Sequence, residues 1–298
     1  MLSLSTCWNS HRHENGEFIA HEAEQLGFSH VELSRELNAD QVQALKGFAT
    51  NGAVRISSVM NDLHCPGNVE FTSDDASVRK EAIALTKRSI ELAASCNARF
   101  VVLTLGRVPM KAYTDELLAL THAGKIYSRE YIRVKLELIE QRAKTAQRYL
   151  DRARTALDEF LPFCESHQVA LGLETRSHYE KLPTEQEMLG LMDHFRDCPW
   201  IGVWHDFGHM QRKANLGLLD HEEALRNIAP RLMGCHLHDV AWPASDHLLP
   251  LSSRGVDYAR LLPLVPKDSV LVWQVKSTIK RAQFFDHMKE WSTLFPVK

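Results

Sequence analysis

The sequence lacks several features that would assign it to a specialised class. No apolar stretch approaches the roughly 20 residues needed to span a bilayer. The first residues, MLSLSTCWNSHRH, hold no basic segment followed by a long apolar one. The six cysteines form no C-x-x-C pair. These absences predict a cytoplasmic protein with free thiols in a reducing compartment, no export signal and no membrane association.

An excess of charge of one sign is also missing. The formal net charge is −3 at pH 7, from 35 basic and 38 acidic residues, so nothing in the composition would attract a nucleic acid. We find no linker, repeat or low-complexity segment that would divide the chain. For 298 residues we expect a single domain, residues 1–298, since α/β barrels fill about 250 residues as one unit. Whether the chain forms a homo-oligomer stays open.

What the sequence contains is a regular alternation of strand-like and helix-like segments. Short β-branched or apolar runs predict eight strands, namely Leu2–Trp8, His30–Ser34, Ala53–Met60, Phe100–Leu105, Val169–Thr175, Ile201–Asp206, Leu232–Leu237 and Val270–Val275. A helical pattern follows each one: Glu17–Leu26, Ala39–Thr50, Ala76–Ser95, Ser128–His167, Thr184–Phe195, His221–Ile228, Tyr258–Val265 and Arg281–Leu294. Repeated right-handed crossovers close such a sheet into a (β/α)₈ TIM barrel. A doubly wound open sheet is the alternative.

Carboxylates and histidines stand at the ends of three of these strands, in GLETR, VWHDFGH and GCHLHD. The carboxyl ends of parallel barrel strands meet at one mouth, so Glu174, Asp206 and His236 can converge there. Mixed oxygen and nitrogen ligands suit one divalent metal ion, which we expect to be Mn²⁺, Mg²⁺ or Zn²⁺.

The alternation of side chains along a strand supports this convergence. In the fifth, sixth and seventh strands the three polar residues share a face with glycines, which suits the crowded interior of a barrel. The same rule applied to the eighth strand directs Gln274 inward at the same height. Gln274 is therefore the predicted fourth ligand.

The chain resembles the xylose isomerase-like TIM-barrel superfamily, in particular its sugar phosphate isomerase/epimerase branch. The matching motifs are GLETR, HDFGH, HLHD and the trailing DHLLPLSSRGVDY, and the resemblance covers nearly the whole length. It implies one divalent cation held by Glu174, Asp206 and His236, with His209 near the substrate oxygens. The fourth ligand of that family is a Glu on strand eight, where this chain has Gln274. Because an amide brings no charge, we expect weaker metal binding than in a three-carboxylate homologue.

The resemblance implies an isomerase or epimerase, or a related lyase, that acts on a sugar, a sugar phosphate or a keto-polyol. In this interpretation Glu174 moves the proton and His209 or Lys276 steadies the developing negative charge. His64, in the loop after strand three, and Trp8 are further candidates for substrate contact. Two alternatives remain: a degenerate, non-catalytic member that binds a sugar or a metal, and a metal-dependent hydrolase with a second metal ion.

Overall fold

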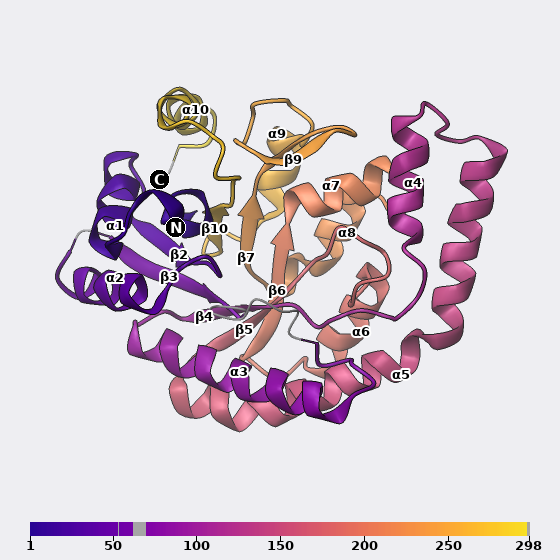
Figure 1. Ribbon diagram of the computed structural model, residues 1–298, viewed down its shortest axis with the longest axis horizontal. Helices are drawn as coiled ribbons and strands as arrows, with labels where there is room; N and C mark the ends of the chain where they lie inside the picture. Colours follow the sequence, from indigo (N-terminus) through magenta and orange to yellow (C-terminus); the bar gives the residue numbers. More distant parts are fainter. Residues whose placement is uncertain (53, 62–69, 297–298) are drawn as a thin grey trace.

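The computed structural model describes residues 1–52, 54–61 and 70–296, and these form a closed barrel of eight parallel strands (Figure 1). The barrel strands are β1 (Leu2–Ser5), β2 (His30–Leu33), β3 (Arg55–Met60), β4 (Phe100–Leu103), β5 (Ala170–Glu174), β6 (Ile201–Asp206), β7 (Leu232–Leu237) and β10 (Val270–Trp273). Around the barrel their order is β1-β10-β7-β6-β5-β4-β3-β2. The predicted TIM barrel is confirmed and the open-sheet alternative is wrong. Ala53, the predicted start of the third strand, lies outside the described residues.

The first strand is shorter than expected. It ends at Ser5, and Thr6–Trp8 form a 3₁₀ turn that is closed by a backbone hydrogen bond from Asn9 to Thr6. The turn directs the Trp8 ring toward Phe284, whose centroid lies 4.2 Å away. Burial of a large aromatic ring at the end of the strand therefore outweighs continuation of the strand.

Helices surround the barrel, and several begin at clear N-terminal caps. They are α1 (Gly16–Gln25), α2 (Ala39–Asn51), α3 (Ala76–Ser95), α4 (Tyr113–His122), α5 (Arg129–His167), α6 (Glu185–His194), α7 (Phe207–Asn215), α8 (His221–Ile228), α9 (Tyr258–Leu261) and α10 (Arg281–Leu294). Capping boxes start two of them: Asn38 with Gln41 at α2, and Thr184 with Glu187 at α6. No helix in the described part of the chain is long and apolar enough to cross a membrane.

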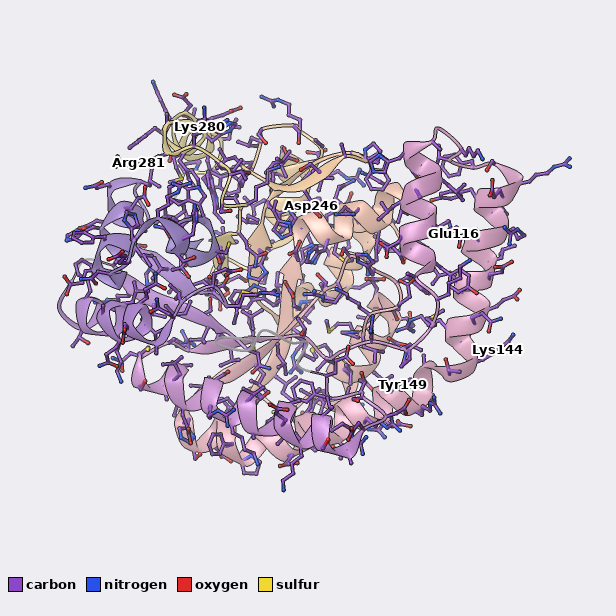
Figure 2. All side chains as sticks on the ribbon, in the orientation of Figure 1. Glu116, Lys144, Tyr149, Asp246, Lys280 and Arg281 are labelled. Carbon is purple, nitrogen blue, oxygen red and sulfur yellow. The ribbon has the colours of Figure 1, made fainter. Side chains whose placement is uncertain are left out.

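Three elements were not expected from the sequence: α4, α7 and a hairpin of β8 (Asp239–Ala241) with β9 (Ser245–Leu248). Helix α4 packs against the first half of α5 at the right edge of Figure 1. These two helices bury an apolar cluster of their own, which includes Leu117, Tyr131 and Leu138. Figure 2 places Glu116, Lys144 and Tyr149 on this side of the molecule, and Asp246 on the hairpin beyond β7.

The barrel interior is packed around Trp204. Its fully buried ring contacts Val102, Val270 and Val272 from other strands. A Cβ atom on Gly172 or on Gly234 would come within 2.8 or 2.5 Å of this ring, so both glycines are needed for its close approach. The layer below the mouth is therefore solid, and the polar strand ends lie above it.

Candidate functional site

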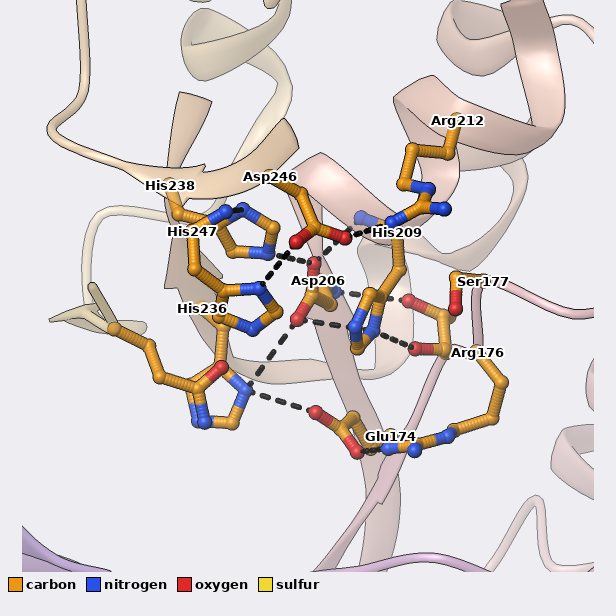
Figure 3. A network of polar contacts seen from close by, with 12 residues as sticks. Glu174, Arg176, Ser177, Asp206, His209, Arg212, His236, His238, Asp246 and His247 are labelled. Atoms are coloured by element: carbon orange, nitrogen blue, oxygen red, sulfur yellow. Dashed lines mark hydrogen bonds and ion pairs between the residues drawn. The ribbon is translucent and has the colours of Figure 1, made fainter. Parts of the chain in front are cut away.

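Three of the predicted ligands meet inside the carboxyl end of the barrel, on neighbouring strands. Glu174 ends β5, Asp206 ends β6 and His236 lies in β7, where it pairs in register with Asp206. His236 Nδ1 lies 3.0 Å from Glu174 Oε1 and 3.8 Å from Asp206 Oδ2 (Figure 3). All three side chains are buried, at no more than 1% exposure. The strand-end convergence expected from the sequence therefore occurs.

Asp206 has one saturated oxygen and one that lacks a hydrogen bond. Its Oδ1 accepts the backbone N–H of His209 at 2.7 Å, which caps α7, and lies 2.9 Å from His238 Nε2. Its Oδ2 lies 3.0 Å from His209 Nδ1, but the angle does not make a hydrogen bond. Burial raises the pKa of Asp206, yet the neighbouring histidines lower it more, so the net pKa is well below the usual range. Asp206 is ionised at neutral pH.

His209 is neutral at pH 7 and has a free lone pair. Burial lowers its pKa well below the usual value of 6.5, although Asp206 opposes this. Its Nδ1 lies 3.2 Å from the carbonyl oxygen of Thr175, which can only accept, so Nδ1 carries the ring proton. The lone pair is consequently on Nε2. In this state Nε2 of His209 can accept a hydrogen bond.

A second group of metal-type side chains shares Asp206. Ligand-type atoms of Asp206, His209, His238 and His247 lie within 4.8 Å of one another. The backbone N–H of His247 donates to His238 Nδ1 at 2.9 Å, so the proton of neutral His238 is on Nε2, where it points at Asp206 Oδ1. Both nitrogens of His238 are thus occupied. We interpret it as a residue that orients Asp206, and not as a free ligand.

The contact between Glu32 and His236 is one that the sequence did not predict. The Glu32 carboxylate is fully buried inside the barrel, accepts a hydrogen bond from Ser58 Oγ at 2.9 Å and has both oxygens 3.1 Å from His236 Nε2. From the sequence, Glu32 is as likely to pair with Arg55 as to contact a substrate. In the structure Arg55 pairs in register with His30, at the start of β2. The available signal was strand parity, because Glu32 alternates with the outward-facing Val31 and Leu33.

A cavity of about 460 Å³ opens at the mouth, and its lining includes Cys7, Arg35, Met60, His247, Gln274 and Lys276. Of the second group around Asp206, His247 lines the cavity, whereas Glu174, Asp206 and His236 are not among its described lining residues. Gln274 is 7% exposed, and its Oε1 makes no hydrogen bond. Lys276 Nζ donates to Ser245 Oγ at 2.9 Å. Burial raises the pKa of Cys7 to about 12, so Cys7 is an unreactive thiol at neutral pH. Two of the predicted site residues, Gln274 and Lys276, therefore lie at this cavity.

Trp8, another predicted substrate contact, does not line the cavity at the mouth. Trp8 is fully buried, and its Nε1 donates to the carbonyl of Ile279 at 2.9 Å. Its ring packs in the core beside α10. His64 lies outside the described residues.

The residues at the mouth fit a divalent cation. Two carboxylates and an imidazole converge, and Asp206 Oδ2 and Gln274 Oε1 are buried oxygens without a hydrogen bond. Leaving a buried polar atom unpaired costs about 1–3 kcal/mol, and a charged one more. A bound cation would supply the missing partner.

A model of the family described as xylose isomerase-like TIM barrel matches residues 20–267, most of the chain. The chain belongs to this family. The membership expected from the motifs is confirmed. No curated protein matches the sequence.

Solved structures similar to this xylose isomerase-like barrel include several sugar epimerases. One is a D-tagatose 3-epimerase-like protein with 17% identity and a TM-score of 0.70, covering 98% of this chain and 97% of that one. Another is an L-ribulose 3-epimerase with 15% identity and a TM-score of 0.70, covering 98% and 93%. A third is the IolI protein with a bound zinc atom, at 14% identity and a TM-score of 0.66, covering 99% of each chain. At these identities the likeness shows a shared fold.

Proposed function

We propose that the protein is a divalent-metal-dependent isomerase or epimerase of a sugar, a sugar phosphate or a keto-polyol. The observation that carries the proposal is the buried convergence of Glu174, Asp206 and His236. A cavity of about 460 Å³ is lined in part by His247, which belongs to the second group around Asp206, and offers room for a substrate at the mouth. The sugar epimerases and the zinc-binding IolI protein among the similar structures support it.

In this proposal Glu174, Asp206 and His236 hold one Mn²⁺, Mg²⁺ or Zn²⁺ ion, with Gln274 as the fourth ligand. When bound, the cation would act as a Lewis acid that makes a carbon-bound proton next to a substrate oxygen more acidic. The ligands fix its place, and the solid Trp204 layer below them keeps bulk water out of the barrel interior.

Two groups of this chain can move the substrate proton. Glu174 is one, but its Oε2 accepts a hydrogen bond from Arg176, which would have to shift before that oxygen takes a proton. The other is His209, with a lone pair on Nε2 and a lowered pKa. Lys276, at the cavity, is a cation that can stabilise the negative charge left on the substrate. Gln274 cannot take a proton, so this site has no opposing carboxylate on strand eight.

The proposal is tested by loading the metal-free protein with Mn²⁺, Mg²⁺ or Zn²⁺ and incubating it with a panel of ketoses and ketose phosphates in D₂O. We expect one ion per chain by calorimetry and metal-dependent incorporation of deuterium at carbon, followed by NMR. His209→Gln leaves the proposed ligands in place, so loss of exchange in the metal-loaded variant identifies His209 as the base, and retained exchange identifies Glu174. Glu174→Gln also changes a metal ligand, so its exchange is compared with the wild type at equal metal occupancy. Absence of both metal binding and exchange would contradict the proposal.

Two other functions are kept as outcomes of the same experiment. The second group, around Asp206, His209 and His247, favours a metal-dependent hydrolase, which predicts a stoichiometry near two ions per chain. A degenerate member that only binds a sugar or a metal, which the amide at Gln274 favours, would bind its ligand but show no exchange with any substrate.

A further inference from the structure

The imidazole of His236 lies between carboxylates on both sides of its ring. Glu174 Oε1 lies 3.0 Å from Nδ1, and both oxygens of Glu32 lie 3.1 Å from Nε2. A neutral imidazole has one N–H and one lone pair, and an ionised carboxylate offers only acceptors. One of the two nitrogens would therefore direct its lone pair at an oxygen, unless the ring takes up a second proton or a metal cation stands between that nitrogen and the oxygen.

The surroundings of the two nitrogens differ. On the Nε2 side, Ser58 donates a hydrogen bond to Glu32, and both Glu32 oxygens lie 3.1 Å from the nitrogen. This suits a single N–H donor. On the Nδ1 side lie Glu174 Oε1 and, at 3.8 Å, the Asp206 oxygen that has no hydrogen bond. If Nε2 carries the only ring proton, Nδ1 directs its lone pair at these two oxygens, and a cation between them would accept it.

We propose that Glu32 is a positioning residue for the metal site: it accepts the Nε2–H of His236 and so presents the Nδ1 lone pair to a cation beside Glu174 and Asp206. The inference rests on the proposed function, because it assumes that this cluster holds an ion. A carboxylate that fixes the tautomer of a ligating histidine also raises the basicity of that histidine.

The location of Glu32 argues against a purely structural role. Glu32 comes from β2 and reaches His236 across the interior from β7, and it is 0% exposed. Burying an ionised carboxylate costs several kcal/mol, and an apolar side chain of similar volume would fill the barrel without that cost. The neighbouring Ser3, Ser57 and Ser58 show that small polar groups are tolerated at this depth. The carboxyl group of Glu32 therefore makes a contact with His236 that an apolar side chain could not make.

Metal affinity tests the inference. Metal-free protein is titrated with Zn²⁺ against a competing chelator, for the wild type, Glu32→Ala, Glu32→Gln and the control Ser57→Ala. Ser57 is buried in the same barrel and hydrogen-bonds Ser3 Oγ at 2.8 Å and Ser58 Oγ at 3.2 Å, so it reaches Glu32 through Ser58. We expect Glu32→Ala to weaken Zn²⁺ binding by about 10–100-fold. Glu32→Gln should recover most of the affinity, because its carbonyl still accepts the N–H, and Ser57→Ala should bind like the wild type.

Nitrogen NMR of the wild type gives a readout that does not depend on any variant folding. Long-range ¹H–¹⁵N spectra of the zinc-loaded protein should show the His236 proton on Nε2 and the metal on Nδ1. A metal on Nε2, or Glu32→Ala with wild-type affinity, would overturn the role of Glu32 and leave the metal site standing. A His236 ring protonated at both nitrogens in protein that binds none of the three ions would overturn the metal site as well.

Discussion

The protein buries charged side chains in two regions, and the two differ in how completely the charges are paired. Between α5 and α6, Arg142 is 4% exposed and donates to both oxygens of Glu187 and to the carbonyl of Tyr179. Lys213 of α7 is 1% exposed and pairs with Glu185 at the start of α6. In this helix network each buried cation has a carboxylate partner.

At the barrel mouth the pairing of buried charges is incomplete. The carboxylates of Glu32, Glu174 and Asp206 surround His236, and Asp206 Oδ2 has no hydrogen bond. Complete pairing stabilises the fold, as expected for buried ions whose partners are all present. Incomplete pairing of acceptors around one point instead indicates a place where a cation binds. The completeness of charge pairing therefore distinguishes the structural network between α5 and α6 from the candidate site at the mouth.

The largest effect is expected in the helix network. Arg142→Ala removes a buried guanidinium and leaves the partly buried Glu187, whose side chain is 15% exposed, without its bidentate partner. It should lower the free energy of unfolding by about 3 kcal/mol. Urea unfolding in the presence of a chelator measures this. The control Arg133→Ala removes a surface pair whose side chains are 58% and 37% exposed, and should leave the free energy of unfolding nearly unchanged. Altered Zn²⁺ affinity in Arg142→Ala would show that the two regions are coupled, against our interpretation.

At the mouth we expect a substitution to have a large effect on metal binding and a small effect on the free energy of unfolding. Asp206→Asn should weaken metal binding on the order of 100-fold, equivalent to about 2.7 kcal/mol, because the cation loses a charged ligand. Its effect on unfolding should stay within about 1 kcal/mol, since Asn also caps a helix and the change removes a buried charge. Calorimetry and urea unfolding of the same sample give both values. A strongly destabilised variant that still binds the ion would refute the assignment.

A third buried cluster, behind β6, sharpens the comparison through its pH dependence. His205 and His221 face each other with their Nε2 atoms 3.1 Å apart, and burial lowers the pKa of His221 to about 4. In the unfolded chain His221 takes up a proton near pH 6.5, whereas in the folded chain it does so only near pH 4. The free energy of unfolding therefore falls as the pH drops from 7 toward 4.

From this shift we expect His221 alone to account for a loss of about 2 kcal/mol between pH 7 and pH 5. His221→Gln cannot take up that proton. Unfolding of metal-free protein at both pH values should show a shallower pH dependence in the variant. Equal slopes in wild type and variant would mean that His221 keeps an ordinary pKa in the folded protein.

The smallest effect concerns the fourth ligand. Gln274→Glu adds a carboxylate with little change in volume and should tighten metal binding roughly tenfold, about 1.4 kcal/mol. The gain should vanish at acidic pH, since the new carboxylate, with a reference pKa of about 4.3, binds metal only when ionised. Calorimetry of the variant and the wild type between pH 3.5 and pH 7 measures it.

Proton exchange at the substrate carbon then distinguishes a two-base mechanism that was lost from a one-base mechanism. Renewed exchange in Gln274→Glu would indicate a lost two-base mechanism, and unchanged turnover would indicate a one-base mechanism in which Gln274 only replaces a ligand. If neither metal binding nor exchange changes, strand eight is not part of the site.

The sequence by itself determined the barrel and the convergence of Glu174, Asp206 and His236. The reason is local, because the alternation of helical and strand periods sets the topology and the two-residue period of a strand sets which side chains face inward. Parity along β6 likewise directs Trp204 and Asp206 to one face. Neither inference requires knowledge of distant contacts.

Only the tertiary structure decided which groups meet across the barrel and which protons they carry. The contact of Glu32 with His236 joins β2 to β7, residues 204 apart in the chain, and depends on strand register and barrel width. Trp8 leaves its strand because Phe284 of α10 offers a buried ring to pack against. The tautomers of His209 and His238 follow from backbone groups of Thr175 and His247. These are long-range or three-dimensional constraints, and no periodic pattern in the sequence encodes them.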